Sequence, residues 1–209
     1  MGRTKIEWCD YSLNPVKGLC KYACSYCYAR KMYKRFKWNP EIRFGGAEYE
    51  FWKISKIKKS SRIFIGSMHD IFGEWIPNTW IEIIIEECRK YPQHTFLFLT
   101  KNPKRYASFE FPKNCWKGAT ITENPLFSIR ENIYKLDFVS MEPLMKKINV
   151  LPAKIKWVIV GGLTQHGKPP HKKQWISDIV KHCRYRHIPI FIKSNAKYPI
   201  KIQQIPKWK

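Results

Sequence analysis

Short, almost uninterrupted apolar segments recur along the chain and limit the folds that it can adopt. Polar clusters follow these segments, and longer amphipathic stretches follow several of the clusters, including helices expected from a cap at Asn78 or Thr79 and over 173–186. Because continuous apolar strands that alternate with helices need cover on both faces, the pattern predicts a parallel sheet in an α/β fold. The expected strands are 62–66, 95–99, 116–121, 138–141, 157–160 and 188–192.

One further strand is expected near 10–16, which gives six or seven βα units. A full eight-fold barrel typically needs about 250 residues, and this chain has 209. The sequence therefore predicts an incomplete TIM-type βα barrel of about six to seven parallel strands, with a doubly wound sheet as the alternative. Since a domain usually takes roughly 100–200 residues, we expect a single domain over 1–209 that ends in a basic tail at about 196–209.

The chain carries a large positive charge, with 39 Lys and Arg against 16 Asp and Glu and a formal net charge of +23. Its 44% hydrophobic content excludes a disordered basic protein. No apolar run approaches the ~18 residues of a membrane span, and no signal peptide is evident, so we expect a cytoplasmic protein without a membrane partner. The charge has two interpretations, an anionic partner such as nucleic acid or a composition merely rich in Lys.

Polar residues follow the end of nearly every predicted strand. In parallel α/β folds the functional groups gather beyond the carboxyl ends of the strands. Their recurrence at this position therefore predicts one shared pocket. The residues are Ser67, His69, Asp70, Thr100, Lys101, Glu123, Asn124, Glu142, Gln165, His166, Lys193 and Asn195.

Seven cysteines fall into two kinds of context. Cys88, Cys115 and Cys183 lie in or beside expected helices and strands, where buried thiols act as small hydrophobic side chains. Another three, with spacing C-x3-C-x2-C, lie close together at Cys20, Cys24 and Cys27. Three thiolates on one loop can hold three corners of an iron–sulfur cluster and leave one iron open. The alternative is a closed zinc site, which needs a fourth ligand such as Cys9 or a His.

The motif Cys20–Cys27, with Tyr26 before its last cysteine, resembles the signature C-x3-C-x-aromatic-C of the radical S-adenosylmethionine (radical SAM) superfamily. Within it, the chain is most similar to a phage-associated three-cysteine-motif family of uncharacterised proteins. Further blocks match in the same order, among them 66–72, 99–103, 140–144 and 157–162. The resemblance extends over almost the whole chain.

This resemblance implies cofactors and site residues. It implies a [4Fe–4S] cluster on the three cysteines, with S-adenosylmethionine chelated at the open iron. Tyr26 would lie near the adenine, and Ser67 and Asp70 would bind the methionine amino group. Lys101 would pair with the cofactor carboxylate or with an anionic substrate, and Glu142 would contact the ribose or the substrate. The full set of implied cofactor-binding residues is Tyr26, Ser67, His69, Asp70, Thr100, Lys101, Glu142, Gly161 and Gly162.

The resemblance also implies an activity. A radical SAM enzyme reductively cleaves S-adenosylmethionine, using an electron donor protein, and the resulting 5′-deoxyadenosyl radical abstracts hydrogen from a substrate. Basic residues interleaved with aromatic ones favour an anionic substrate, nucleic acid or a nucleotide, and hence DNA repair or modification. Two alternatives stay open: a radical SAM enzyme that acts on a peptide or small metabolite, and a non-enzymatic nucleic-acid-binding module stabilised by zinc or a cluster.

Overall fold

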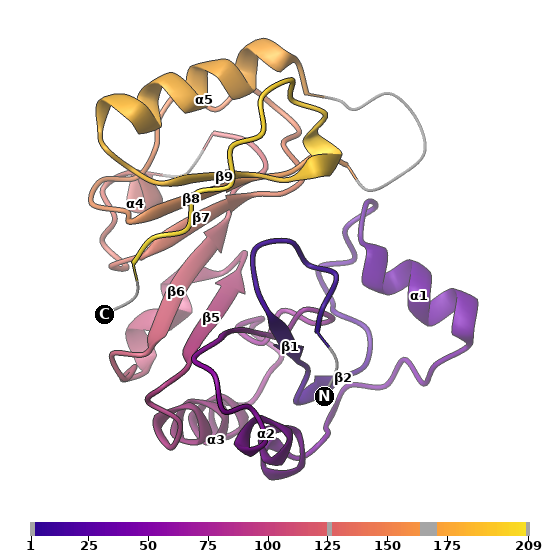
Figure 1. Ribbon diagram of the computed structural model, residues 1–209. Coiled ribbons are helices and arrows are strands. Elements are labelled where there is room, and N and C mark those ends of the chain that lie inside the picture. The colour runs from indigo at the N-terminus through magenta and orange to yellow at the C-terminus, as the bar shows by residue number, and fades with distance from the viewer. Residues whose placement is uncertain (1–2, 125–126, 164–170, 208–209) are drawn as a thin grey trace. The chain divides into compact units, whose positions relative to one another are not determined.

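The computed structural model describes residues 3–124, 127–163 and 171–207 (Figure 1). The chain divides into two compact units, Met1–Trp116 and Lys117–Lys209. The cysteine motif and the polar residues after the strands at 62–65 and 95–100 belong to the first unit. Glu142, Gly161 and Gly162 belong to the second unit.

The sheet of the first unit contains β1 (Tyr11–Leu13), β4 (Arg62–Ile65) and β5 (Thr95–Thr100) in the order β1-β4-β5. Neighbouring strands are parallel, with Ser12 opposite Phe64 and Phe64 opposite Leu97. Almost every residue of β4 and β5 is buried. This burial explains why these strands read as continuous apolar segments instead of alternating ones.

Helices α2 (Ala47–Ser55) and α3 (Asn78–Arg89) pack against each other in the first unit (Figure 1). In α3, apolar side chains at helical spacing are buried, including Ile81, Ile84, Ile85 and Cys88. The prediction of a cap at Asn78 or Thr79 is wrong, because Pro77 is the N-cap and no side chain caps the helix. Asn78 instead accepts a hydrogen bond of 2.6 Å from Arg105, which lies in the 3-10 helix η1 (Pro103–Ser108).

The second unit also contains a set of parallel strands. Its strands β6 (Cys115–Thr120), β7 (Phe138–Met141), β8 (Trp157–Val160) and β9 (Ile190–Ile192) follow the order β6-β7-β8-β9, and all neighbours are parallel. Strand β6 starts at the last residues of the first unit. Helix α4 (Phe127–Arg130) is short, whereas α5 (Lys173–Tyr185) is long and buries Ile176, Ile179, Val180 and Cys183.

The expected basic tail over about 196–209 forms part of the second unit as far as it is described. After the 3-10 turn η2 (Ser194–Ala196), the chain runs back along β9. Ile192 donates its N–H to the carbonyl of Ile202 (2.7 Å), and Gln204 donates to the carbonyl of Ile190 (3.0 Å). These hydrogen bonds hold the segment on the edge strand.

Seven parallel strands with intervening helices confirm the predicted fold class, an α/β chain of the partial βα-barrel type. All six predicted main strands are present within two residues of the expected bounds, and the extra strand expected near 10–16 is the shorter β1, Tyr11–Leu13. Within the described part of the chain, no helix combines the length and the apolar character that a membrane span requires.

Candidate functional site

The cysteine loop lies in an insertion of the first unit that is closed by two short strands. β2 (Val16–Lys17) pairs antiparallel with β3 (Arg43–Phe44), and the loop and α1 (Tyr28–Phe36) lie between them in the sequence. Gly18 begins the loop at φ +98°, and a Cβ there would lie 2.2 Å from the Glu41 carbonyl oxygen. Only glycine fits this close approach, which makes it a requirement of the insertion.

Accessibility separates the seven cysteines into two groups. Cys20, Cys24 and Cys27 are partly exposed, whereas all the others are buried, and all seven are free thiols. The prediction that Cys88, Cys115 and Cys183 are buried is confirmed. Cys9, a conceivable fourth metal ligand, is also buried, and its thiol lies 3.9 Å from the Ile6 carbonyl oxygen. The accessible thiols are therefore those of the cysteine loop.

The loop supplies the right donors for an iron–sulfur cluster, namely three accessible thiols on one short segment. Among the residues that the structure describes, no group of three or more His, Cys, Asp or Glu side chains is arranged so that it could hold a metal ion. Burial raises the pKa of the Cys20 thiol, and backbone hydrogen bonds from Asp70 and Tyr22 act against this effect. The type, number and accessibility of the three loop thiols therefore suit a cluster, whereas their positions in the structure do not group them as metal ligands.

Hydrogen bonds fix the cysteine loop to the carboxyl ends of β4 and β5. Lys101 Nζ, just after β5, lies 2.9 Å from the Tyr26 hydroxyl. The Tyr28 hydroxyl donates to the carbonyl of Ser67, just after β4, and Arg30 donates to the Cys20 carbonyl at 3.0 Å. The structure therefore holds the cysteine loop beside Ser67 and Lys101, at the ends of β4 and β5.

Asp70 is the centre of a compact hydrogen-bond network after β4. Its Oδ1 accepts from the Thr100 hydroxyl (2.8 Å) and the Phe72 N–H (3.0 Å), and its Oδ2 accepts from the Lys101 N–H (2.8 Å). Burial raises the pKa of Asp70, while the hydrogen bonds from Lys101, Thr100 and Phe72 oppose that rise. Thr100 in turn accepts from the Asn102 N–H at 2.9 Å, so the ends of β4 and β5 are tied through one carboxylate.

Ser67 is bound by a residue that the sequence analysis did not single out. Its hydroxyl donates to Asn14 Oδ1 (3.1 Å), and Asn14 Oδ1 also accepts from the Met68 N–H at 2.8 Å. Asn14 directly follows β1, and Ser67 and Lys101 likewise come just after the ends of β4 and β5. The sequence analysis missed it because the strand expected near 10–16 included Asn14, whereas β1 ends at Leu13.

His69 has a different environment from its neighbours. It is 3% exposed, its Nδ1 lies 3.0 Å from the Gly18 carbonyl oxygen, and its Nε2 accepts from the Trp75 indole at 2.9 Å. A neutral ring with its proton on Nδ1 satisfies both contacts. Both nitrogens are therefore committed within the protein, and His69 holds the start of the cysteine loop.

We expect the free energy of unfolding to fall as pH is lowered through about 6.5. Burial lowers the pKa of His69, and also that of His94 and His182, below the usual 6.5. The unfolded chain then takes up protons that the folded chain does not, so acid favours unfolding in this window. Urea titrations at pH 7 and pH 5 measure the loss.

The variant His69→Gln retains a donor and an acceptor but does not titrate. It should show a smaller loss between pH 7 and pH 5 than the parent chain. If the free energy of unfolding of His69→Gln fell between pH 7 and pH 5 as much as that of the parent chain, His69 would not contribute to this loss.

Glu142 lies in a second polar cluster, in the second unit. Its carboxylate accepts from the Ser140 hydroxyl (2.7 Å) and pairs with Lys193 Nζ (2.7 Å). These residues stand at the ends of β7 and β9, and Gly161 after β8 completes the set. A Cβ at Gly161 would lie 2.7 Å from Glu142 Oε1, so glycine makes room for the carboxylate.

Gly162 serves a different contact from Gly161. Gly162 and Asn195 exchange two hydrogen bonds, from the Gly162 N–H to Asn195 Oδ1 (3.1 Å) and from Asn195 Nδ2 to the Gly162 carbonyl (2.9 Å). A Cβ here would lie 2.4 Å from the Asn195 carbonyl oxygen and 2.9 Å from the ring of the buried His171. Backbone on one side and a buried ring on the other leave no space for a side chain.

The remaining predicted polar clusters do not add to these sites. Glu123 forms an exposed ion pair with Lys146 (2.6 Å), and Asn124 accepts from the Asn149 N–H at 3.1 Å. Gln165 and His166 lie outside the described residues. The predicted pocket is thus represented by two sets of contacts, one in each unit, and the prediction that they form one pocket stays a prediction.

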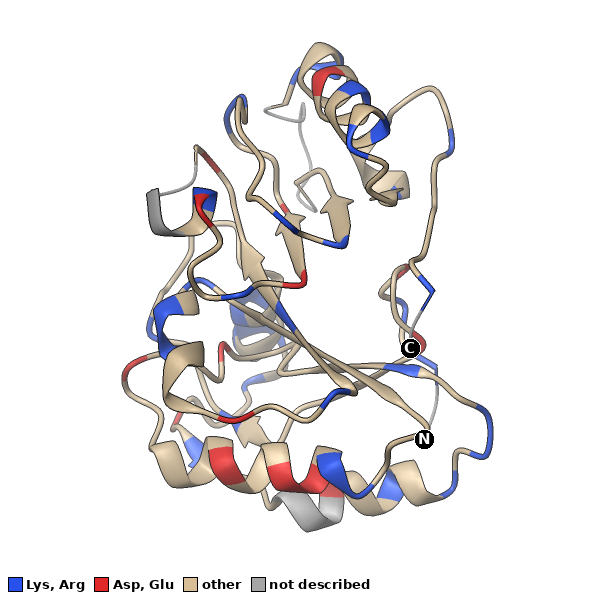
Figure 2. Ribbon diagram, turned by 90° about the vertical axis from the view of Figure 1, so that its left-hand side faces the viewer, with Lys and Arg blue, Asp and Glu red and all other residues tan. Residues whose placement is uncertain are grey.

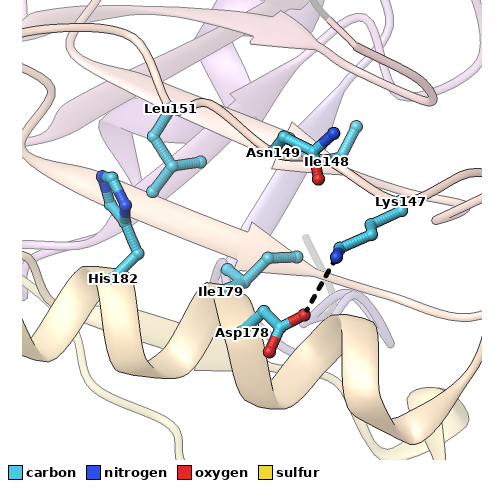
Figure 3. A pocket seen from close by; sticks show the side chains of 7 residues that line it. All are labelled: Lys147, Ile148, Asn149, Leu151, Asp178, Ile179 and His182. Carbon is cyan, nitrogen blue, oxygen red and sulfur yellow. Dashed lines mark ion pairs between the residues drawn. The ribbon is translucent and has the colours of Figure 1, made fainter.

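A cavity of about 350 Å³ opens in the second unit between α5 and the segment before β8 (Figure 3). Asp178 and His182 on α5 face Lys147 and Asn149, and Lys147 Nζ lies 3.7 Å from Asp178 Oδ2. Its lining residues are Lys147, Ile148, Asn149, Leu151, Asp178, Ile179 and His182. None of them belongs to the predicted site residues.

Basic residues are spread along the chain instead of being confined to one element. Figure 2 shows Lys and Arg on several helices and in many of the loops. Most acidic residues are matched with a Lys or Arg partner, as in Lys17–Glu50 and Arg62–Asp10. The excess positive charge therefore lies on residues beyond these pairs.

The fold and the accessible cysteine loop define an α/β protein of the partial βα-barrel type with a three-cysteine insertion after β2. The chain belongs to the family DUF5131, described as a protein of unknown function, whose model matches residues 3–207. No curated protein and no solved structure matches the chain.

Proposed function

We propose that this chain is a radical SAM enzyme that binds a [4Fe–4S] cluster at Cys20, Cys24 and Cys27 and acts on an anionic substrate, nucleic acid or a nucleotide. The observation that carries the proposal is the partition of the thiols. Only the three cysteines of the motif are accessible, and the other four are buried. A chain that merely contained many cysteines would have no reason to expose these three alone.

The chemistry that such a cluster supplies when bound is one-electron reduction of the sulfonium of S-adenosylmethionine. The protein's own part is to bind and orient the cofactor. A carboxylate offers roughly four lone-pair sites, and Asp70 uses three for Thr100, Phe72 and Lys101. The remaining site suits the methionine ammonium group, which donates charged hydrogen bonds.

Tyr26 and Lys101 complete the cofactor side of the proposed site. The Tyr26 ring belongs to the cysteine loop, and Lys101 Nζ lies 2.9 Å from its hydroxyl and 5.5 Å from its ring centroid. The ammonium of Lys101 supplies positive charge for the cofactor carboxylate, while the ring offers a flat surface to the adenine. We expect the protein to act in the cytoplasm, where thiols stay reduced.

The decisive experiment is anaerobic reconstitution with iron and sulfide, reduction with dithionite, and measurement of 5′-deoxyadenosine formed from S-adenosylmethionine. We expect a brown protein that forms this product, with and without added nucleic acid. The matched control is the variant Cys24→Ala, which should form none. A colourless protein that binds zinc and forms no product from S-adenosylmethionine would replace the enzyme by a metal-stabilised binding module.

The substrate class is tested by asking which compounds increase the formation of 5′-deoxyadenosine. Product formation that rises with nucleic acid, but not with peptides or small metabolites, supports an anionic polymer as substrate. Stimulation by a peptide alone would move the proposal to a peptide-modifying radical SAM enzyme, and the net charge of +23 would then be a matter of composition.

A further inference from the structure

An exposed aromatic pair lies at the end of α1, directly after the cysteine loop. Phe36 is the last residue of the helix, and Lys37 follows in the left-handed conformation at φ 50°. This turn folds Trp38 back, and its N–H donates to the Tyr33 carbonyl at 3.1 Å. The rings of Phe36 and Trp38 stack with centroids 5.3 Å apart and an interplanar angle of 23°.

The pair stays open to solvent although it is held firmly. Phe36 is 50% exposed and Trp38 is 44% exposed. Trp38 also contacts the buried Tyr33 ring edge-on at 5.3 Å, and the Tyr33 hydroxyl accepts from the Gly18 N–H at 2.7 Å. The aromatic surface is therefore anchored to the start of the cysteine loop.

Positive charge surrounds this pair. The exposed cations of the helix and its cap are Lys31, Lys34, Arg35 and Lys37. The Arg35 guanidinium lies 5.4 Å from the Phe36 ring centroid. Residues 11–40 contain no Asp or Glu, and no ion pair is found for these four cations in the part of the chain that the structure describes.

We propose that Phe36 and Trp38, with Lys34, Arg35 and Lys37 around them, form a binding platform for single-stranded nucleic acid. Aromatic faces stack on unpaired bases without regard to sequence, and nearby Lys and Arg neutralise the phosphates. Arginine beside an aromatic ring adds a cation–π contribution. The inference deepens the proposed function and rests on it, because the platform would deliver a strand to the cysteine loop that α1 directly follows.

A membrane surface is the competing partner for a basic amphipathic helix, and the burial of α1 argues against it. An interfacial helix needs a continuous apolar face that is free to enter the lipid. In α1 the apolar residues Ala29 and Tyr33 are buried within the protein. Tyr28 at the start of the helix is exposed, but its hydroxyl is bound to the Ser67 carbonyl. The other exposed large apolar groups of α1 and its end are the rings of Phe36 and Trp38, which suit bases better than an acyl layer.

The test is the affinity of the full-length protein for a short fluorescent oligothymidylate, measured by anisotropy over a range of salt concentrations without S-adenosylmethionine. The double variant Phe36→Ala/Trp38→Ala should bind the oligonucleotide at least about tenfold more weakly than the parent chain. Trp38→Phe should retain most of the affinity. Lys34→Ala/Lys37→Ala should weaken binding and reduce the salt slope by roughly 1.4, the value for two phosphate contacts on a single strand.

Matched controls come from the same unit. Trp52 is 55% exposed on α2, and Lys58 and Lys59 are exposed beyond that helix. Trp52→Ala and Lys58→Ala/Lys59→Ala remove the same kinds of group elsewhere, so they should change the affinity little. Circular dichroism melting should show that every variant folds.

Three results would overturn the platform. The first is equal loss of affinity in the platform and control variants, which means that net charge alone binds the strand. The second is tighter binding to duplex than to single strands. The third is binding to anionic phosphatidylserine vesicles that depends on Phe36 and Trp38 while oligonucleotide binding does not. Because the assay omits S-adenosylmethionine, its outcome is independent of whether 5′-deoxyadenosine is formed.

Discussion

Replacing any one of Cys20, Cys24 or Cys27 by Ala should reduce the iron and sulfide content after anaerobic reconstitution to the background level. Thiolates are the ligands of such clusters, and two remaining thiols cannot hold three corners. Formation of 5′-deoxyadenosine should be lost together with the iron. The measurements are iron and sulfide analysis, the visible absorption of the cluster, and chromatographic detection of the nucleoside.

The control for this prediction is a cysteine of the other group. Cys183→Ala removes a buried thiol from α5, so it should lower stability by about 1 kcal/mol and leave the iron content unchanged. The loop variants should show the reverse, with melting of the metal-free chain close to that of the parent. Equal iron loading of Cys183→Ala and a loop variant would refute the assignment of the cluster to the loop.

Asp70→Ala should be the most destabilising single change in the candidate site. It removes the acceptor for Thr100, Phe72 and Lys101 at once, and an unsatisfied buried donor costs roughly 1–3 kcal/mol. Because Thr100 and Phe72 are buried and lose this acceptor together, we expect a loss of about 2–4 kcal/mol in the free energy of unfolding. Urea denaturation of the metal-free protein measures it.

Two further variants test the reason for this loss. Asp70→Asn retains one acceptor oxygen but turns an NH2 group toward a donor, so its stability should lie between those of Asp70→Ala and the parent. Glu123→Ala breaks only an exposed ion pair with Lys146, which solvent screens, and should change the free energy of unfolding little. If Asp70→Ala were no more costly than Glu123→Ala, the carboxylate would not tie β4 to β5.

The strands could be predicted because a strand that is buried on both faces is a continuous run of apolar residues. Such a run can be recognised without knowing which strands lie beside it. β4, β5, β7 and β8 are runs of large apolar residues, and their bounds are confirmed within two residues. Helix α5 carries buried residues at Ile176, Ile179, Val180 and Cys183, a clear helical period. Elements with this much burial are visible in the sequence itself.

Helix α1 and the strand pair β2–β3 could not be predicted in the same way. Only Ala29 and Tyr33 of α1 are buried, so few apolar residues mark the buried face of this basic helix. β2 and β3 have two residues each and are separated by the whole insertion. Their pairing depends on contacts between distant residues, which a local pattern does not contain.

The candidate site was predicted by position more successfully than by role. Ser67, Asp70, Thr100 and Lys101 were expected at strand ends, and the structure joins the last three through the Asp70 carboxylate. His69 has the same place in the sequence, yet both of its ring nitrogens are used by the fold. Residue type and spacing do not reveal which side chains the protein itself has already engaged.

The lysines near the C-terminal segment that lies along β9 also affect self-association of the chain. An open edge strand offers unpaired N–H and C=O groups to another copy of the chain, and charged lysines near such an edge oppose that pairing. Here the edge of β9 is occupied by residues 202–204, with the exposed Lys201 and Lys207 on either side. Two copies that approached through this edge would bring like charges together, so these lysines help to keep the chains apart.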